Sequence, residues 1–323
     1  MSDEILKIER EKVYLNAGWR SSAREPRQQD YDAYRLTKTG AEVSPASMSY
    51  DDHSWEKVCL PHDFMVLQEL DPLQRDYNGY LEQKNCWYRR FFKLSKDDKK
   101  KRLVLHLDGV SGESQIWVNG CLMLARHSAY LDAVIDITDV VRFGDAVNLI
   151  AVYMDHSQMQ GWWYQGGGLY RDVWLEKMNR IYIDEQDLQI ITEERESKWV
   201  VKACFTVRAR YGWLENSKCD PAGVYATVTD PKGDKVGEIK ASLIENHSCK
   251  SGARVKSVRS SMEFQIENPD LWDIYQGNCY RLDIQISENG RICDRYQERF
   301  GIRSIDFDSE NGFYLNGKRR EIR

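Results

Sequence analysis

The chain has 323 residues, a formal net charge of -5 and 41% hydrophobic residues, which predicts about two domains with cores of ordinary size. The mild acidity argues against a nucleic-acid-binding protein, because such a protein presents a basic face to the phosphates. We therefore expect no nucleic-acid partner. Residues 1–12 (MSDEILKIEREK) lack the apolar segment of a secretion signal, and no stretch approaches the ~20 apolar residues of a membrane helix. We therefore also expect no membrane partner and a cytoplasmic location.

Period-2 alternation of apolar residues is common in the first half of the chain. In chain order, residues 102–108 (RLVLHLD), 115–123 (QIWVNGCLM), 146–154 (AVNLIAVYM) and 170–176 (YRDVWLE) are predicted to be strands. Asn119-Gly120 divides two apolar runs. This dipeptide predicts a hairpin, because both positions of its turn require a positive φ.

The strand pattern starts again after about residue 178. Strands are predicted at residues 181–191, 199–210, 223–229, 261–266, 279–287 and 292–300, whereas the polar residues 245–259 are predicted to form a long loop or a weak edge. Several short strands separated by turns are typical of a β-sandwich. We therefore expect an all-β protein.

The last residues begin a new pattern. Residues 312–318 (GFYLNGK) again have the order strand, Asn-Gly turn, strand, and the sequence stops at residue 323. A hairpin alone is marginally stable in water. We therefore expect this segment to lead into a domain that the sequence does not contain.

Cysteine and histidine patterns predict neither a metal nor a cofactor. The eight cysteines form no Cys-x-x-Cys pair, so no zinc site of the usual spacing is predicted. Without a secretion signal these cysteines are expected to be free thiols in a reducing compartment.

Four segments, in order, resemble glycoside hydrolase family 2, and the β-galactosidase branch best. They are residues 55–64 (WEKVCLPHDF); 87–92 (WYRRFF) with 105–120 (LHLDGVSGESQIWVNG); 161–175 (GWWYQGGGLYRDVWL); and 268–272 (NPDLW) with 300–303 (FGIR) and 312–318. Each segment alone is a weak signal, and their order and spacing make the resemblance specific.

The resemblance implies a jelly-roll, galactose-binding-like sandwich over residues 10–178 and an immunoglobulin-like sandwich over residues 179–303. Residues 304–323 would then be the truncated start of the family's catalytic TIM barrel. Such a barrel needs about 250 residues. We therefore expect the chain to depend on a missing barrel domain or on a barrel-containing partner chain.

Members of the family cleave β-glycosides with retention, which requires two facing carboxylates roughly 5–5.5 Å apart. In the family both are glutamates of the barrel, and the acid/base glutamate follows an asparagine. This sequence contains no Asn-Glu dipeptide. We therefore assign no catalytic residue and expect the chain alone to be inactive. The resemblance implies that it is the N-terminal part of an enzyme whose substrate is a β-galactoside or a related sugar.

The resemblance places candidate sugar-contacting residues in two loops. Trp162, Trp163, Tyr164 and Gln165 precede three glycines, where the first domain leans over the barrel mouth in the family. The alternative is that Trp163 and Tyr164 only fill the interface with the barrel. Asn78 is the candidate in the second loop, with a simple Asn-Gly turn as its alternative.

Two further expectations concern the same region. The Pro61-His62-Asp63 segment is interpreted as structural, and Arg171 is expected to pair with a carboxylate and hold the glycine loop. A free-standing carbohydrate-binding module and an assembly module that complements a barrel-containing partner remain alternatives to the truncated enzyme.

Overall fold

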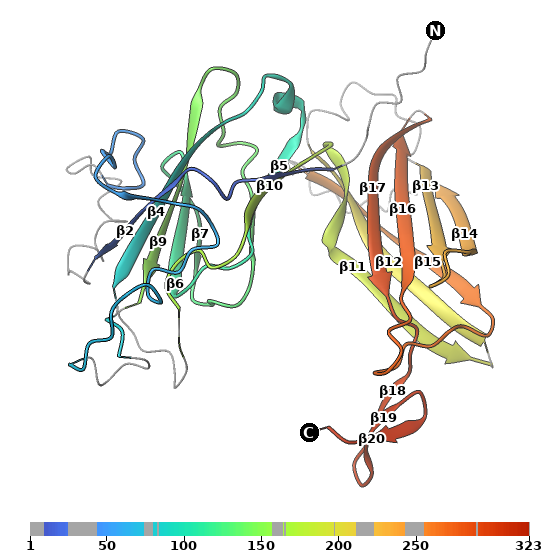
Figure 1. Cartoon of the computed structure of the whole chain (residues 1–323). Coiled ribbons are helices and arrows are strands. Elements are labelled where there is room, and N and C mark those ends of the chain that lie inside the picture. The colour runs from blue at the N-terminus through green and yellow to red at the C-terminus, as the bar shows by residue number, and fades with distance from the viewer. Residues whose placement is uncertain are drawn as a thin grey trace. The chain divides into compact units, whose positions relative to one another are not determined.

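The computed structural model describes residues 10–24, 44–73, 80–82, 84–156, 164, 166–196, 198–210, 223–242, 255–288 and 290–322. Within these ranges the regular structure is β-strand apart from one 3-10 turn, η1 (Asp97–Lys100) (Figure 1). The expected all-β fold is confirmed. No helix in the described part of the chain has the length and hydrophobicity that crossing a membrane requires.

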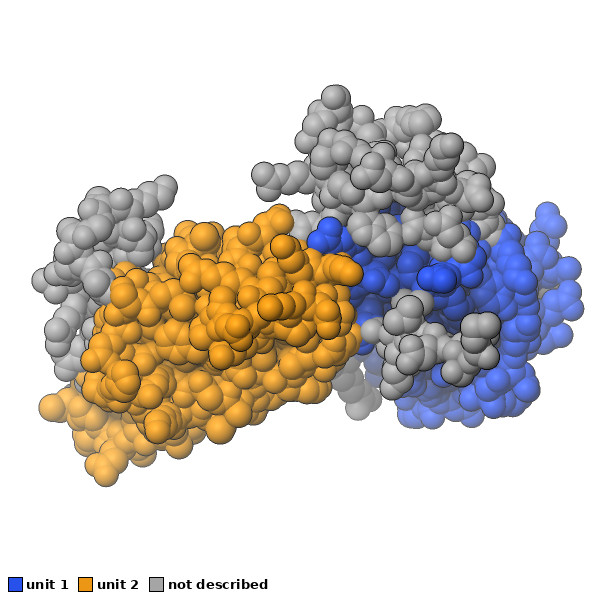
Figure 2. All heavy atoms as spheres, turned by 90° about the horizontal axis from the view of Figure 1, so that it is seen from above, with its two compact units in different colours: residues 1–10, 178–323 blue, residues 11–177 orange. Residues whose placement is uncertain are grey.

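The chain forms two compact units, which Figure 2 shows in separate colours. Residues 11–177 form one unit, called here the first sandwich. Arg10 and the described residues from Met178 onward belong to the other, called here the second sandwich.

Two sheets build the first sandwich. The larger has the order β3 (Glu56–Val58), β2 (Trp19–Arg24), β4 (Asn85–Lys93), β9 (Val147–Asp155), β6 (Glu113–Val118) and β7 (Cys121–Arg126). The smaller has the order β1 (Glu11–Tyr14), β10 (Val173–Met178), β5 (Arg102–Leu107) and β8 (Ala133–Asp136).

The apolar alternation of the sequence places the core of the first sandwich. Leu103, Leu105 and Leu107 of β5 are fully buried in the main hydrophobic cluster, as their shared face predicts. The predicted hairpin joins β6 to β7, with positive φ angles of 51° at Asn119 and 82° at Gly120.

The outer face of the larger sheet carries a second, aromatic cluster. Trp87 on β4 stacks on Trp117 on β6, with ring centroids 5.2 Å apart, and contacts Tyr153 on β9 at 4.9 Å. Trp55 packs in the same cluster. Residues of one strand therefore alternate between two apolar layers, so β4 is buried on both faces.

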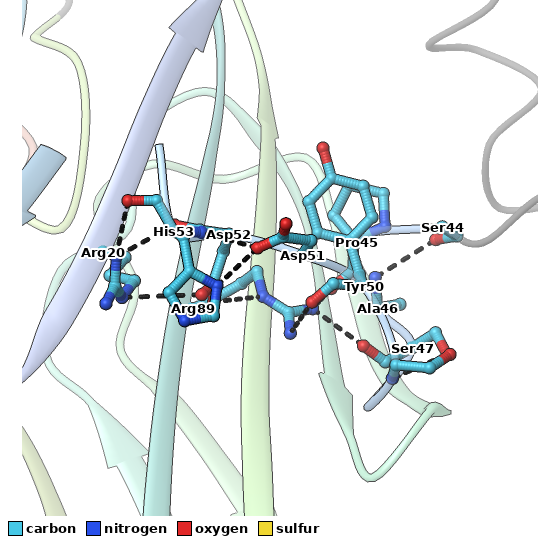
Figure 3. A network of polar contacts seen from close by, with 11 residues as sticks. Arg20, Ser44, Pro45, Ala46, Ser47, Tyr50, Asp51, Asp52, His53 and Arg89 are labelled. Atoms are coloured by element: carbon cyan, nitrogen blue, oxygen red, sulfur yellow. Dashed lines mark hydrogen bonds and ion pairs between the residues drawn. The ribbon is translucent and has the colours of Figure 1, made fainter. Parts of the chain in front are cut away.

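A buried guanidinium fastens residues 44–53 to this outer face (Figure 3). Arg89 on β4 donates to Asp52 Oδ2 at 2.8 Å, and its side chain is fully buried. It also donates to the carbonyl oxygens of Pro45, Ser47 and Tyr50. One arginine thus donates to four oxygens of this segment, a use suited to its five fixed N–H groups.

The second sandwich also has two sheets. One has the order β11 (Ile181–Arg195), β12 (Lys198–Arg210) and β15 (Val255–Ile266), and the other β14 (Lys235–Ser242), β13 (Gly223–Thr229), β16 (Tyr280–Glu288) and β17 (Arg291–Phe300). Strand β15 begins six residues earlier than residue 261, where the sequence predicted it. Pairing with β12 along its whole length supplies the backbone hydrogen bonds that these polar residues need.

Arg10 is an anchor of the second sandwich. Its guanidinium donates to both carboxylate oxygens of Asp294, at 3.2 and 2.9 Å, to Glu185 Oε2 at 3.0 Å and to the carbonyl oxygen of Ile183 at 2.6 Å. Asp294 is only 2% exposed. A buried carboxylate held in this way depends on its cation, because an unpaired buried charge is strongly unfavourable.

The last described residues form the predicted hairpin with one additional strand. The sheet has the order β18 (Ile305–Asp308), β19 (Gly312–Leu315) and β20 (Lys318–Arg320). The turn residue Asn316 donates from Nδ2 to the carbonyl oxygen of Trp272 at 3.0 Å, and Arg320 donates to Asp273 at 2.8 Å. The hairpin is therefore fastened to the second sandwich by polar contacts.

Candidate functional site

Of the predicted sugar-contacting residues, Tyr164 is the one that the structure describes. Its side chain is 43% exposed, and its hydroxyl donates a hydrogen bond of 2.9 Å to Asp63 Oδ2. Asn78, Trp162, Trp163 and Gln165 lie outside the described residues. The candidate site therefore consists of Tyr164, the glycines that follow it and the side chains that hold them.

Backbone hydrogen bonds align the glycine loop, residues 166–169, with the Pro61-His62-Asp63 segment. The amide of His62 donates to the carbonyl oxygen of Leu169 at 2.8 Å, and the amide of Phe64 donates to that of Gly167 at 2.7 Å. The two segments, a hundred residues apart in sequence, thus form a short two-stranded arrangement.

Close packing explains the glycines. A Cβ at Gly167 would lie 2.4 Å from Met65 Cγ, and a Cβ at Gly168 would lie 2.4 Å from the Tyr88 hydroxyl and 2.5 Å from the His62 carbonyl oxygen. Gly168 also has a φ of +133°, a conformation that other residues rarely adopt. No larger residue fits these positions without moving the loop.

Asp63 is a side chain that fixes the exposed side of the loop. Its Oδ1 accepts hydrogen bonds from the amides of Met65 and Gly167, both at 2.9 Å, and its Oδ2 accepts the Tyr164 hydroxyl. A carboxylate that accepts three donors is a positioning group, which agrees with the structural interpretation of the Pro-His-Asp segment. Burial, and then the hydrogen bond to Asp63, raise the pKa of Tyr164, so its phenol stays a neutral donor.

A second aromatic contact lies under the same segment. His62 Nδ1 and the Tyr88 hydroxyl are 2.6 Å apart. Burial lowers the pKa of His62 and raises that of Tyr88. At neutral pH both groups are therefore uncharged, and this part of the site is held by a neutral hydrogen bond.

The expected role of Arg171 is wrong. Among the described residues, no carboxylate oxygen forms an ion pair with its guanidinium, which instead lies 5.6 Å from the ring centroid of its neighbour Tyr170. Its side chain is exposed. The loop is held by Asp63 and by backbone pairing, so it does not need an arginine.

Comparisons with known proteins identify both sandwiches. The family model described as the galactose-binding domain-like domain of glycosyl hydrolase 2 matches residues 65–165, and the family model of glycosyl hydrolases family 2 matches residues 181–303. A β-galactosidase of Bacteroides ovatus is 29% identical over 314 residues, which are 95% of this chain and 35% of that protein. A β-glucuronidase of Formosa agariphila is 24% identical over 299 residues, which are 85% of this chain and 29% of that protein.

Solved structures agree on the fold. A β-glucuronidase 2 of Bacteroides uniformis, covalently bound to a cyclophellitol-6-carboxylate aziridine, superposes with a TM-score of 0.77 at 22% identity, over 98% of this chain and 35% of that chain. A family 2 glycosyl hydrolase of Bacteroides cellulosilyticus gives a TM-score of 0.73 at 24% identity, over 95% of this chain and 38% of that one.

Fold and family matches together define two successive β-sandwiches of the kinds that the glycosyl hydrolase family 2 models describe. The chain belongs to glycoside hydrolase family 2. It spans about a third of the length of the relatives just named.

Proposed function

We propose that this chain is the N-terminal part of a retaining β-glycosidase and that its glycine loop completes the sugar pocket, while bond cleavage is carried out by the catalytic barrel of the family. The observation that carries the proposal is Tyr164, a half-exposed aromatic residue on a loop fixed by Asp63. Aromatic faces bind the C–H surface of a sugar, and a rigid loop loses little entropy when it does so.

A β-galactoside is the proposed substrate. The β-galactosidase of Bacteroides ovatus is 29% identical to the chain, whereas the β-glucuronidase of Formosa agariphila is 24% identical. A related sugar, such as a β-glucuronide, is the alternative, because relatives named β-glucuronidase share the same two sandwiches.

The finer architecture is also a proposal. We assign a jelly-roll, galactose-binding-like sandwich to residues 10–178, an immunoglobulin-like sandwich to residues 179–303 and the start of a TIM barrel to residues 304–323. Support for the second comes from the strands of its described residues, which form one sheet of three and one of four. The chain crosses between the two sheets after β12, after β14 and after β15. A cytoplasmic location stays a prediction from the sequence.

Sugar titration tests the role of Tyr164. We expect methyl β-galactoside to bind the chain weakly in calorimetry, and Tyr164→Ala to weaken binding about three- to tenfold, the range of one aromatic contact. Tyr130→Ala is the matched control, because Tyr130 is a tyrosine of the same sandwich that is 61% exposed. Equal affinity of the Tyr164 variant and the parent chain would refute the contact.

Hydrolysis assays test whether the chain only completes the sugar pocket while the barrel cleaves the bond. A chromogenic β-galactoside should not be hydrolysed by the chain itself. A chimera in which the chain replaces the matched part of the Bacteroides ovatus β-galactosidase should hydrolyse it, and Tyr164→Ala should lower kcat/KM in that chimera. Hydrolysis by the chain alone would overturn the proposal, and sugar binding without any effect in the chimera would favour a free-standing binding module.

A further inference from the structure

A buried serine and histidine lie directly beneath the glycine loop. Ser111 lies between β5 and β6, His156 follows β9, and they are 0% and 1% exposed. Ser111 Oγ lies 2.9 Å from His156 Nε2 and accepts a hydrogen bond of 2.5 Å from the amide of Gly168. The amide of Ser111 in turn donates to the carbonyl oxygen of Gly168 at 3.1 Å.

The partners of these groups fix the direction of every hydrogen bond. His156 Nδ1 lies 3.0 Å from the carbonyl oxygen of Lys84, which can only accept, so Nδ1 carries the proton. The other ring nitrogen is then an acceptor, and the Ser111 hydroxyl donates to it at 2.9 Å, with Met154 Sδ at 3.6 Å as a second, weaker acceptor. Burial lowers the pKa of His156 to about 4, which keeps this neutral form at physiological pH.

The backbone is shaped around the pair. A Cβ at Gly112 would lie 2.6 Å from the Asp155 carbonyl oxygen and 3.0 Å from His156 Nε2, and Gly112 has a φ of +65°. The amide of His156 also donates to Asn85 Oδ1 at 3.0 Å. The imidazole is therefore held at both ring nitrogens and at its backbone.

Ser111 bonds to both ends of one segment of the sequence. His156 precedes residues 157–165 and Gly168 follows them, and these residues include Trp162 and Trp163. We propose that Ser111 is a positioning residue, whose hydroxyl holds His156 and Gly168 together and so fixes the glycine loop to the end of β9. The link from this anchor to a sugar rests on the proposed function, whereas the anchor itself does not.

Hydrogen exchange of the loop tests the anchor. Ser111→Ala leaves the Gly168 amide and His156 Nε2 without their partner, so amides of residues 164–170 should exchange about tenfold faster. Ser114→Ala is the matched control, because Ser114 is 2% exposed and its hydroxyl has no hydrogen-bond partner among the described residues. Exchange that is unchanged in Ser111→Ala would overturn the proposal.

The imidazole supplies a second, spectroscopic readout. In the parent chain the nitrogen resonances of His156 should show a protonated Nδ1 and a hydrogen-bonded, unprotonated Nε2, and Ser111→Ala should shift Nε2 alone. His156→Asn keeps a donor for the Lys84 carbonyl and removes the acceptor for Ser111, so it should accelerate exchange as Ser111→Ala does. A protonated Nε2 in the parent chain would contradict the assigned direction.

Calorimetry separates this inference from the proposed function. If methyl β-galactoside does not bind the parent chain but Ser111→Ala still loosens the loop, the proposed function fails and the anchor stands. If the parent chain binds the sugar and the Ser111→Ala variant binds it equally well although its loop amides exchange faster, the positioning role is wrong. Loosening together with weaker binding is the expected result.

Discussion

Removing the Asp63 carboxylate is the most informative perturbation of the glycine loop. Asp63→Ala deprives the Met65 amide, the Gly167 amide and the Tyr164 hydroxyl of their acceptor. A hydrogen bond to a charged group contributes about 1.5–3 kcal/mol. Because Asp63 is only half-buried, water molecules can accept some of these hydrogen bonds in the variant. We therefore expect the free energy of unfolding of the first sandwich to fall by about 2–3 kcal/mol.

Two smaller changes divide this effect between its parts. Asp63→Asn keeps an oxygen for the two amides, and its NH₂ group can donate to the Tyr164 oxygen, so we expect a loss of about 1 kcal/mol or less. Tyr164→Phe removes only the phenol hydrogen bond and should also cost about 1 kcal/mol. Asp71→Ala is the control in the same region, because Asp71 is partly exposed like Asp63 and the one hydrogen bond described for its carboxylate is to the amide of Leu73.

Urea unfolding measures these differences. The two compact units should give two transitions in tryptophan fluorescence, and the Asp63 variants should shift only one of them. The positioning role of Asp63 is refuted if Asp63→Ala unfolds within about 0.5 kcal/mol of the parent chain. It is also refuted if Asp63→Asn is as unstable as Asp63→Ala, because the loop would then depend on charge and not on the acceptor oxygens.

Three further outcomes follow from buried charges and one buried imidazole. Arg89→Met leaves buried oxygens without donors and weakens the pairing of Asp52, so urea unfolding should show a loss of about 3–5 kcal/mol in the first sandwich. Arg10→Ala leaves Asp294 buried without its cation and should destabilise only the second sandwich, by about 2–4 kcal/mol, which the second urea transition measures. The pKa of His156 is about 4 in the folded state and 6.5 for a histidine in the unfolded chain. Its contribution to the free energy of unfolding is therefore complete above pH 6.5 and is lost as the pH falls towards 4, by about 3 kcal/mol in all. Urea unfolding at several pH values should show that the free energy of unfolding falls less over this range in His156→Asn than in the parent chain.

The all-β class and the hairpins could be predicted from the sequence. Alternation along residues 102–108 and the Asn-Gly pairs at 119–120 and 316–317 are local features, and their turn geometry depends on neighbours in the chain. The family could be predicted for the same reason, because its motifs are short and keep their order. Strand β14 (Lys235–Ser242) was missed, since its residues carry little apolar alternation and pair because β13 lies beside them.

The sequence by itself thus determined the all-β class, the Asn-Gly turns, the family and the position of Tyr164 next to three glycines. The tertiary structure alone decided which side chains hold that loop. Asp63 and Tyr164 are 101 residues apart, and Ser111 is 57 residues from Gly168 and 45 from His156. Such contacts leave no periodic signal in the sequence, because they arise only when the pairing of distant strands brings the loop ends to one edge of the sandwich.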